Sequence, residues 1–242
     1  MVNPYKELDK GKKAQVALMF NNIARKYDFL NHVLSMGIDK LWRKKAVKLL
    51  KPLQPKRILD IATGTGDFAL ANLKLNPDKV VGIDISTEML AVGREKIAKK
   101  NLSDKIELFE GDSENIQFED NSFDAITVAF GVRNFENLEK GLKEMNRVVR
   151  PGGKVVILEF SKPRNFPIKQ IYNFYFFRIL PFWGKMVSKD SSAYTYLPES
   201  VDAFPDGADF LKIYNECGFI DTKQIKLSFG IASIYIGTKP VQ

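Results

Sequence analysis

The chain has 242 residues, 45% of them hydrophobic and 27% charged, which excludes a disordered protein and fits one large globular domain. Its single cysteine, Cys217, and single histidine, His32, exclude an internal disulfide, a cysteine-rich zinc site and most histidine-based metal clusters. The formal net charge is +8, and residues 1–56 carry 13 Lys and Arg against 4 Asp and Glu, so the basic excess lies in the N-terminal part.

This N-terminal part has a helical pattern over residues 16–51, and we expect it to pack on the rim of a sheet that follows it. Within it, Lys40–Lys51 places Leu41, Trp42, Ala46 and Leu49 toward one side of a helix, with six basic residues around them. Such a segment binds nucleic acid or an anionic membrane, or is a solvated helical face, and charge alone does not decide. No apolar run reaches the ~18–20 residues of a membrane span, and no secretory signal begins the chain. We expect a cytoplasmic protein, with the inner face of the membrane left open.

From residue 57, strand-like and helix-like segments alternate. The apolar runs predict five strands, at Arg57–Ala62, Val80–Ile85, Ile106–Phe109, Phe123–Phe130 and Lys154–Phe160. Helices are predicted between them at Phe68–Leu75, from Ser86, and at about Leu138–Val149, the last ended by Pro151-Gly152-Gly153. This alternation is typical of βαβ units and predicts an α/β fold with a parallel, doubly wound sheet.

Two later segments depart from this alternation. Between Phe160 and Trp183, nine of 24 residues are aromatic, where the 12% of the whole chain would give about three. The C-terminal part is predicted to form a helix over Gly207–Cys217, with Cys217 buried, and then two strands, Ile220–Phe229 and Ser233–Thr238, joined by a turn at Gly230. A terminal hairpin of this kind is unusual in a dinucleotide-binding fold.

A glycine loop follows the first predicted strand. Gly64–Ala69 (GTGDFA) fits G-x-G-x-x-A between a strand and a helix, and Asp84 lies twenty residues beyond Gly64. This spacing fits an NAD site, in which the glycines permit a tight turn and the carboxylate binds the ribose hydroxyls.

The charges around the loop favour a different ligand. A dinucleotide brings a pyrophosphate to the helix N-terminus, where Asp60 and Asp67 would repel it. The same carboxylates suit S-adenosylmethionine, which carries an ammonium and a sulfonium and no phosphate. Asp84 can bind its ribose hydroxyls, and Asp112, in Gly111-Asp112-Ser113 after the third strand, can accept from the adenine amino group. Because ligands of doubly wound sheets bind at the carboxyl ends of the strands, the four acids together favour this methyl donor over NAD.

Five segments carry more specific motifs. DIATGTGD (60–67) is similar to motif I of class I methyltransferases, with Ala62 in place of the first glycine of GxGxG. The other four are YDFLNHVLSMGIDKLW (27–42), with Asp39 where a histidine is common, FGVRN (130–134), RVVRPGGKVVILEFS (147–161), with Arg150 for the usual lysine, and YTYLPESVDAFP (194–205). Together they cover most of the chain and resemble the UbiE/MenG family of quinone-biosynthesis C-methyltransferases.

The resemblance implies a class I S-adenosylmethionine-dependent methyltransferase: a Rossmann-like doubly wound sheet of seven strands with a C-terminal antiparallel hairpin. It implies C-methylation of a polyprenylated hydroquinone, from demethylmenaquinol to menaquinol or, alternatively, of a 2-methoxy-6-polyprenyl-1,4-benzoquinol. It also implies that Thr65, Asp84, Asp112 and Ser113 contact the cofactor. The full predicted cofactor-binding set is Asp60, Gly64, Thr65, Gly66, Asp67, Asp84, Asp112, Ser113 and Ala129. We expect no metal.

The predicted catalytic residues are Arg133, Asn134 and Tyr194. The ring carbon becomes nucleophilic when the hydroquinone loses a hydroxyl proton, so the site needs a group that stabilises negative charge. Arg133, just past the fourth strand, is expected to hold the phenolate, because a pKa above ~12 makes arginine a poor base. Asn134 is expected to orient the same oxygen. The alternative for Arg133 is a structural ion pair with an acid such as Glu136. Tyr194 and Tyr196 are candidates for hydrogen bonds to a quinol oxygen, or pack in an aromatic core or lid.

We expect one methyltransferase domain over residues 1–242: a basic helical extension (1–56), a cofactor-binding core (57–160), an aromatic substrate or lid insertion (161–206), and a C-terminal helix and hairpin (207–242). The insertion offers an apolar wall to a polyprenyl tail, and the helix at 40–51 offers a contact to an anionic membrane. An NAD-dependent oxidoreductase is the alternative from another class. A nucleic-acid methyltransferase lacks support, because no Asn/Asp-Pro-Pro-aromatic motif follows the fourth strand. We expect a quinol substrate and no nucleic acid, with membrane association and a homodimer left open.

Overall fold

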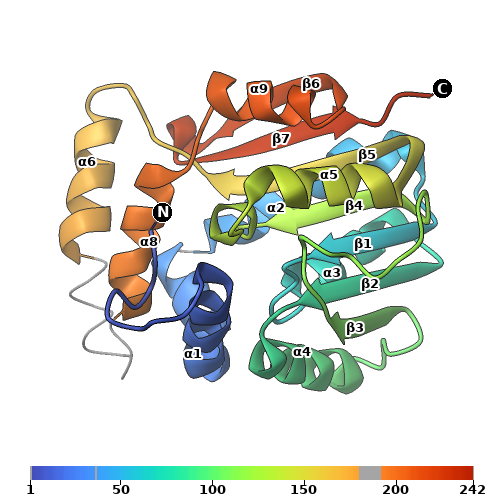
Figure 1. Ribbon diagram of the computed structural model, residues 1–242, viewed down its shortest axis with the longest axis horizontal. Coiled ribbons are helices and arrows are strands. Elements are labelled where there is room, and N and C mark those ends of the chain that lie inside the picture. Colours follow the sequence, from blue (N-terminus) through green and yellow to red (C-terminus); the bar gives the residue numbers. More distant parts are fainter. Residues whose placement is uncertain (1, 36, 180–191, 242) are drawn as a thin grey trace.

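One seven-stranded sheet organises the molecule (Figure 1). The computed structural model describes residues 2–35, 37–179 and 192–241, with the side chains of residues 29–34, 177 and 194 outside the described set. The strands are β1 (Arg57–Ile61), β2 (Lys79–Asp84), β3 (Ile106–Glu110), β4 (Phe123–Ala129), β5 (Val149–Phe160), β6 (Ile220–Leu227) and β7 (Ala232–Thr238). They lie in the order β3-β2-β1-β4-β5-β7-β6, with β1 to β5 parallel and β7 antiparallel to β5 and β6. The predicted doubly wound sheet with a C-terminal antiparallel hairpin is confirmed.

Strand β5 begins at Val149 and not at Lys154, where it was predicted to begin. Val149 pairs with Phe123 of β4, and the pairing resumes at Lys154 after a register shift. Gly153 lies in this irregularity, where a Cβ would be 2.7 Å from the carbonyl oxygen of Asp124. The Pro-Gly-Gly run is therefore an irregular stretch within a strand. Proline and glycine are common both in such irregularities and in turns, so the sequence does not distinguish the two.

Helices cover both faces of the sheet. On one face lie α2 (Ile38–Leu50), α3 (Asp67–Asn72) and α4 (Thr87–Lys99), and on the other α5 (Leu138–Val148) and α9 (Ala208–Glu216). Neighbouring residues of β1 serve opposite faces: Ile58 packs with the first group of helices and Leu59 with the second, and both are fully buried. Such burial on both faces is typical of parallel sheets and explains the continuous apolar runs of the strands.

The sequence analysis expected this helix to pack on the rim of the sheet. Helix α2 instead covers a face of the sheet. Trp42, Ala46 and Leu50 repeat every four residues and are buried against the strands. Trp42 Nε1 also donates a hydrogen bond of 3.0 Å to Ser228 Oγ, in the turn η5 (Ser228–Gly230). The predicted membrane-facing apolar side therefore belongs largely to the protein core, whereas Leu41 is 64% exposed.

Three helices lie beyond the carboxyl ends of the parallel strands and form a cap over them (Figure 1). These are α1 (Lys12–Leu34), α6 (Ile168–Phe174), continued by the π-helical turn η4 (Tyr175–Ile179), and α8 (Ser192–Ala203). Met19 of α1 packs in one cluster with Tyr196 of α8, and Tyr172 of α6 packs in another with Val201 of α8. Residues 180–183 of the predicted aromatic segment lie outside the described residues. Ligands of doubly wound folds bind at these strand ends, which here face the cap.

Candidate active site

The loop after β1 turns sharply because three of its residues have left-handed backbone conformations. Ala62 (φ 51°), Gly64 (φ 55°) and Gly66 (φ 81°) lie in this region, which favours glycine. Gly131, just after β4, approaches this loop so closely that a Cβ on it would lie 2.6 Å from the Cβ of Ala62. The loops after the two central strands therefore meet at a point that requires a glycine on one side.

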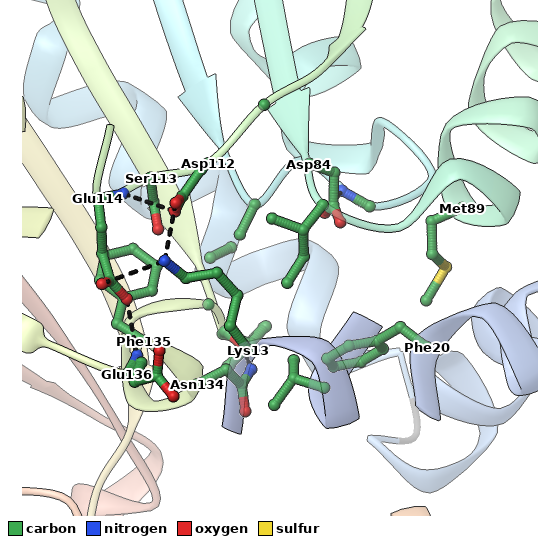
Figure 2. A pocket seen from close by; sticks show the side chains of 18 of the residues that line it. Lys13, Phe20, Asp84, Met89, Asp112, Ser113, Glu114, Asn134, Phe135 and Glu136 are labelled. Carbon is green, nitrogen blue, oxygen red and sulfur yellow. Dashed lines mark hydrogen bonds and ion pairs between the residues drawn. The ribbon is translucent and has the colours of Figure 1, made fainter. Parts of the chain in front are cut away.

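A cavity lies between these loops and α1, and we call it the acidic cavity (Figure 2). Its wall includes Gly64, Asp84, Asp112, Ser113, Glu114, Ala129 and Asn134 from the sheet side and Lys13, Val16, Phe20 and Tyr27 from α1. The fold thus brings five of the predicted cofactor-binding residues to one place. They come from the ends of β1, β2, β3 and β4, as expected for parallel strands whose carboxyl ends share an edge.

Asp84 is fixed at the end of β2 by two backbone N–H groups. Gly64 N donates to its Oδ2 and Ser86 N to its Oδ1, each at 2.8 Å. Burial raises the pKa of Asp84 to about 6, because desolvation outweighs the hydrogen bonds to its charged form. Each carboxylate oxygen has a second lone pair, so Asp84 can still accept hydrogen bonds from two ligand hydroxyls.

Asp112 forms a closing contact with α1 across the cavity. Lys13 Nζ lies 2.7 Å from Asp112 Oδ2 and 3.3 Å from Glu114 Oε2 (Figure 2). With α1 held there, the free space in the acidic cavity is about 60 Å³. Small-molecule sites usually offer ~300–1,000 Å³, so this space is smaller than a typical cofactor site while the contact between α1 and Asp112 is in place.

Asp60 lies behind the wall of the acidic cavity. It is 1% exposed and accepts hydrogen bonds from Thr63 Oγ1 at 2.6 Å and Thr127 Oγ1 at 2.7 Å. Burial raises its pKa to about 6. In this structure Asp60 supports the glycine loop from below, and its oxygens meet two threonines.

Thr65, Gly66 and Asp67 also lie outside the described cavity wall. Lys96 Nζ of α4 lies 2.9 Å from Asp67 Oδ1, and Thr65 Oγ1 donates to Asp28 Oδ1 of α1 at 2.5 Å. Gly66 is the N-cap of α3. These residues tie the glycine loop to α1 and α4. The expected convergence of four acids therefore holds for Asp84 and Asp112, whereas Asp67 meets a lysine from the next helix.

A second cavity of about 350 Å³ lies between the cap and α2, and we call it the apolar cavity. Its wall includes Met19, Ile23, Trp42, Phe160, Tyr172, Tyr175, Phe176, Tyr196 and Ile231. Phe20, Tyr27 and Phe130 line both this cavity and the acidic cavity, so the two adjoin at these three side chains. The predicted aromatic segment contributes Phe160, Tyr172, Tyr175 and Phe176 to the apolar wall.

Arg133 and Asn134 lie on the turn η3 (Val132–Asn134), where the two cavities adjoin, but they line different ones. Arg133 lines the apolar cavity, and its Nη1 lies 2.8 Å from Oε1 of Glu159, a fully buried acid of β5. Its guanidinium also lies 5.6 Å from the ring centroid of Phe160. Asn134 lines the acidic cavity, but its Nδ2 and Nη1 of Arg133 both donate to the carbonyl oxygen of Phe130, at 3.3 Å and 2.5 Å. The expected joint role of the two side chains toward a quinol oxygen stays a prediction. The ion-pair partner of Arg133 is Glu159 and not Glu136.

Three residues of α1 that the sequence analysis did not identify shape the site. Lys12 Nζ donates to the carbonyl oxygens of Arg133, at 3.0 Å, and Phe135, at 2.7 Å, and so fixes the turn η3. Burial lowers the pKa of Lys12 to about 8. Lys13 forms the contact across the acidic cavity, and Phe20 lines both cavities. The hydrogen-bond partners Arg133, Phe135 and Asp112 lie 99 to 123 residues away from these lysines, so no local pattern indicates them.

Tyr194 lies in α8, and its side chain is outside the described set. Tyr196, the other predicted tyrosine, lines the apolar cavity and is 2% exposed. Cys217 is 5% exposed, which confirms that it is buried. Among the described residues, no group of three or more His, Cys, Asp or Glu is placed to hold a metal ion.

Comparison with known proteins identifies the family. The model of the ubiE/COQ5 methyltransferase family matches residues 8–239. The chain is 50% identical to a demethylmenaquinone methyltransferase of Bacteroides fragilis, over 98% of this chain and 97% of the relative, and 48% identical to a ubiquinone/menaquinone biosynthesis C-methyltransferase of Geotalea daltonii, over 97% and 100%. Its fold is similar to that of an S-adenosylmethionine-dependent methyltransferase from Thermotoga maritima, with a TM-score of 0.64, 19% identity and coverage of 92% and 98% of the two chains. The chain therefore belongs to the ubiE/COQ5 methyltransferase family.

Proposed function

We propose that the protein transfers the methyl group of S-adenosylmethionine to a ring carbon of demethylmenaquinol and so forms menaquinol. The observation that carries the proposal is the pair of adjoining cavities, one acidic and one apolar, with Phe20, Tyr27 and Phe130 in both walls. The first suits a cationic methyl donor, and the second suits an apolar ring with a prenyl tail. Relatives named demethylmenaquinone methyltransferase, at 50% and 43% identity, support this acceptor.

The residues of the acidic cavity fit the methyl donor. Asp84 has the oxygens to bind two ribose hydroxyls, and Asp112 with Ser113 offers acceptors to the adenine amino group once Lys13 withdraws. Asn134 lines the acidic cavity, and its Oδ1 is buried without a hydrogen-bond partner among the described residues. We therefore assign this oxygen to binding of the methyl donor. When bound, S-adenosylmethionine supplies an electrophilic methyl group on a positively charged sulfur. Acidic walls stabilise that charge and would repel the pyrophosphate of NAD.

Arg133 and Glu159 supply the charge arrangement on the acceptor side. A guanidinium group carries N–H donors and no acceptor, so Arg133 is proposed to stabilise a phenolate and not to remove its proton. Glu159 is 0% exposed and forms an ion pair with Arg133. The backbone N–H of Arg133 also donates a hydrogen bond of 3.4 Å to Glu159 Oε2. The pair keeps the guanidinium at the wall of the apolar cavity. Because Phe20, Tyr27 and Phe130 border both cavities, a ring in the apolar cavity and a methyl donor in the acidic cavity would lie next to each other, which is the positioning that direct methyl transfer needs.

An anaerobic methylation assay tests the proposal. The purified protein, with S-adenosylmethionine carrying a labelled methyl group, is given demethylmenaquinol or the matched 2-methoxy-6-polyprenyl-1,4-benzoquinol, both kept reduced. We expect transfer to the naphthoquinol at least tenfold faster than to the benzoquinol. Faster methylation of the benzoquinol would assign the alternative substrate, and transfer to neither would overturn the proposal.

We also propose peripheral contact with an anionic membrane at its cytoplasmic side, through a surface that keeps the exposed part of the predicted helix at 40–51 and adds the rim of the apolar cavity. None of the described helices has both the length and the apolar character that crossing a membrane requires. Ile171 and Phe229, which line the apolar cavity, are 62% and 82% exposed. On α2, Leu41 is exposed with Lys45 one helical turn away. Apolar residues at the cavity beside basic ones suit an anionic bilayer that delivers a prenylated quinol.

Vesicle co-sedimentation tests the membrane contact. We expect binding to anionic vesicles that weakens with salt and is reduced in Phe229→Ser. Equal binding to neutral and anionic vesicles would contradict it. A homodimer stays a prediction, which sedimentation velocity tests.

A further inference from the structure

The wall of the apolar cavity includes four buried polar atoms that have no hydrogen-bond partner among the described residues. One is Nε of Arg43, whose Nη1 forms an ion pair with Asp39 of the same helix. The other three are the hydroxyl oxygens of Tyr172 and Tyr196 and Nε of Arg133. The two tyrosines are 7% and 2% exposed, and the Arg133 side chain is 7% exposed. Buried polar groups in folded proteins nearly always have a partner, so three orphan groups on the wall of one cavity indicate a ligand with polar atoms.

These three side chains come from different elements and are held in place by other contacts. Tyr172 of α6 stacks on Phe176, with ring centroids 4.3 Å apart. Tyr196 of α8 packs in a cluster with Met19 and Ile23 of α1. Nη1 of Arg133 is engaged by Glu159, which leaves Nε on a guanidinium that cannot turn freely. The three groups are therefore fixed before a ligand binds, as electrostatic stabilisation of a transition state requires.

Both tyrosines are neutral phenols in this setting. Burial raises the pKa of Tyr196 to about 12 and that of Tyr172 well above its ordinary value, and in both cases Arg133 counteracts part of the rise. Neither hydroxyl is therefore ionised near neutral pH, and neither can act as a base there. Each has a proton to donate, as has Nε of Arg133.

We propose that the Tyr172 and Tyr196 hydroxyls and the Nε–H of Arg133 form a donor site for the quinol oxygen on which negative charge develops. This inference rests on the proposed function. The quinol hydroxyl loses its proton to water. The ring carbon then bonds to the methyl group as the carbon–sulfur bond breaks and its electron pair stays on sulfur, and the same ring carbon finally loses its hydrogen as a proton. Donors bind the oxygen most strongly while it is charged, so this site lowers the pKa of the bound quinol.

Structural tyrosines elsewhere in the molecule look different. The hydroxyl of Tyr214, which is fully buried in the core, donates to the carbonyl oxygen of Val155 at 3.0 Å. The hydroxyl of Tyr235 accepts from the backbone N–H of Gly207 at 2.8 Å. A tyrosine that serves packing and stability thus finds its partner within the protein, which Tyr172 and Tyr196 do not among the described residues.

The test compares Tyr172→Phe, Tyr196→Phe and the double variant with the wild-type protein, using demethylmenaquinol under anaerobic conditions. The pH profile of kcat reports the ionisation of the bound quinol. We expect each single variant to shift this profile upward by about one pH unit and to lower kcat at pH 7 by roughly tenfold or more. Affinity for S-adenosylhomocysteine should change by less than about twofold, because its cavity is a different one. The melting temperature should stay equal or rise, since an unpartnered hydroxyl has been removed.

Tyr214→Phe is the matched control, because it removes a buried hydroxyl that has a partner. It should lower the melting temperature and leave the pH profile in place. If the wild-type protein methylates the quinol and both cavity variants keep the wild-type profile, the donor site is refuted while the proposed function stands. The same holds if the variants only lose stability, as the control does. Absence of methyl transfer by the wild-type protein overturns both.

Discussion

The two cavities of this protein are built in different ways. The acidic cavity is formed mainly by loops that directly follow neighbouring parallel strands. Its main residues, such as Asp84 and Asp112, therefore lie at or just after the carboxyl end of a strand. The apolar cavity combines residues from Met19 to Ile231, on α1, α2, α6, α8 and the β6–β7 connection. The cavity proposed for the methyl donor is thus formed mainly by the sheet, and the cavity proposed for the methyl acceptor is formed mainly by the cap.

This division predicts that a change in one cavity alters one half of the reaction and leaves the other nearly intact. The largest separation is expected at Arg133. In Arg133→Ala, kcat should fall by about 100-fold or more, because the positive charge beside the developing phenolate is lost. Affinity for S-adenosylhomocysteine, measured by calorimetry, should stay within about twofold. Arg150→Ala, which breaks an ion pair of 2.9 Å with Asp124 away from both cavities, is the control and should leave kcat unchanged. If kcat decreases by less than about threefold, Arg133 has no role in the mechanism.

The converse separation is expected at Asp84. Asp84→Ala removes the acceptor for the ribose hydroxyls, so the affinity for S-adenosylhomocysteine should weaken by about 100-fold, since hydrogen bonds to a charged group are worth ~1.5–3 kcal/mol each. Binding of the quinone, followed through quenching of tryptophan fluorescence, should change little, because Trp42 and its neighbours line the other cavity. Asp78→Ala, at an exposed carboxylate, is the control. Equal loss in both binding measurements would show that the cavities are not independent.

The pH dependence distinguishes Asp84 from Asp60, since burial raises the pKa of each to about 6. Of the two, only Asp84 lines the acidic cavity, and a carboxylate binds hydroxyls better than a carboxylic acid does. Affinity for S-adenosylhomocysteine should therefore fall by about tenfold per pH unit below pH 6. Asp84→Asn should abolish this dependence and Asp60→Asn should preserve it.

The free energy of unfolding changes with pH in the direction opposite to that of ligand affinity. Because the folded-state pKa values of Asp60 and Asp84 exceed the ordinary value of 3.8, the folded state holds more protons between about pH 4 and pH 6. The contribution of these groups to the free energy of unfolding therefore falls as pH rises through this window. Urea unfolding at several pH values measures the slope, which should decrease in Asp60→Asn. An unchanged slope would contradict the raised pKa.

A smaller effect is expected where the loops after β1 and β4 meet. The Cβ introduced by Gly131→Ala would lie 2.6 Å from that of Ala62, so the free energy of unfolding should decrease by about 1–3 kcal/mol. Ala62→Gly removes the clashing atom and suits the left-handed conformation at φ 51°. The double variant should therefore recover most of the loss. Additive effects in a double-mutant cycle would show that the two loops are not in contact.

The smallest effect is expected at Lys13, the closing contact of the acidic cavity. Lys13→Gln frees Asp112 and loosens α1, so affinity for S-adenosylhomocysteine should increase by about twofold to fivefold, the value of a partly exposed ion pair. Lys6→Gln breaks a more exposed pair with Glu199 and should leave affinity unchanged. Weaker binding in Lys13→Gln would show that Lys13 holds the ligand and does not exclude it.

The sequence analysis succeeded where chain order and spatial order coincide. The strand ends that carry Gly64, Asp84 and Asp112 were located by apolar periodicity and by the residues that follow each run. The same reasoning did not predict that Asp67 meets Lys96, that Arg133 meets Glu159, or that α2 covers a face of the sheet. Each of these contacts depends on which helix packs beside which strand. The residues next to Asp67 or Arg133 in the sequence carry no information on that packing.

The amino-acid sequence by itself determined the parallel sheet, its C-terminal hairpin and the acids at the strand ends, because strand period, glycine turns and carboxylate positions are local properties. Only the tertiary structure decided which acids line the acidic cavity and that α1 contacts them. It also decided that Tyr172, Tyr196 and Arg133, from separate elements, bring donors without a partner among the described residues to one apolar cavity. Those outcomes depend on packing among segments far apart in the chain, where burial and partner choice are settled together.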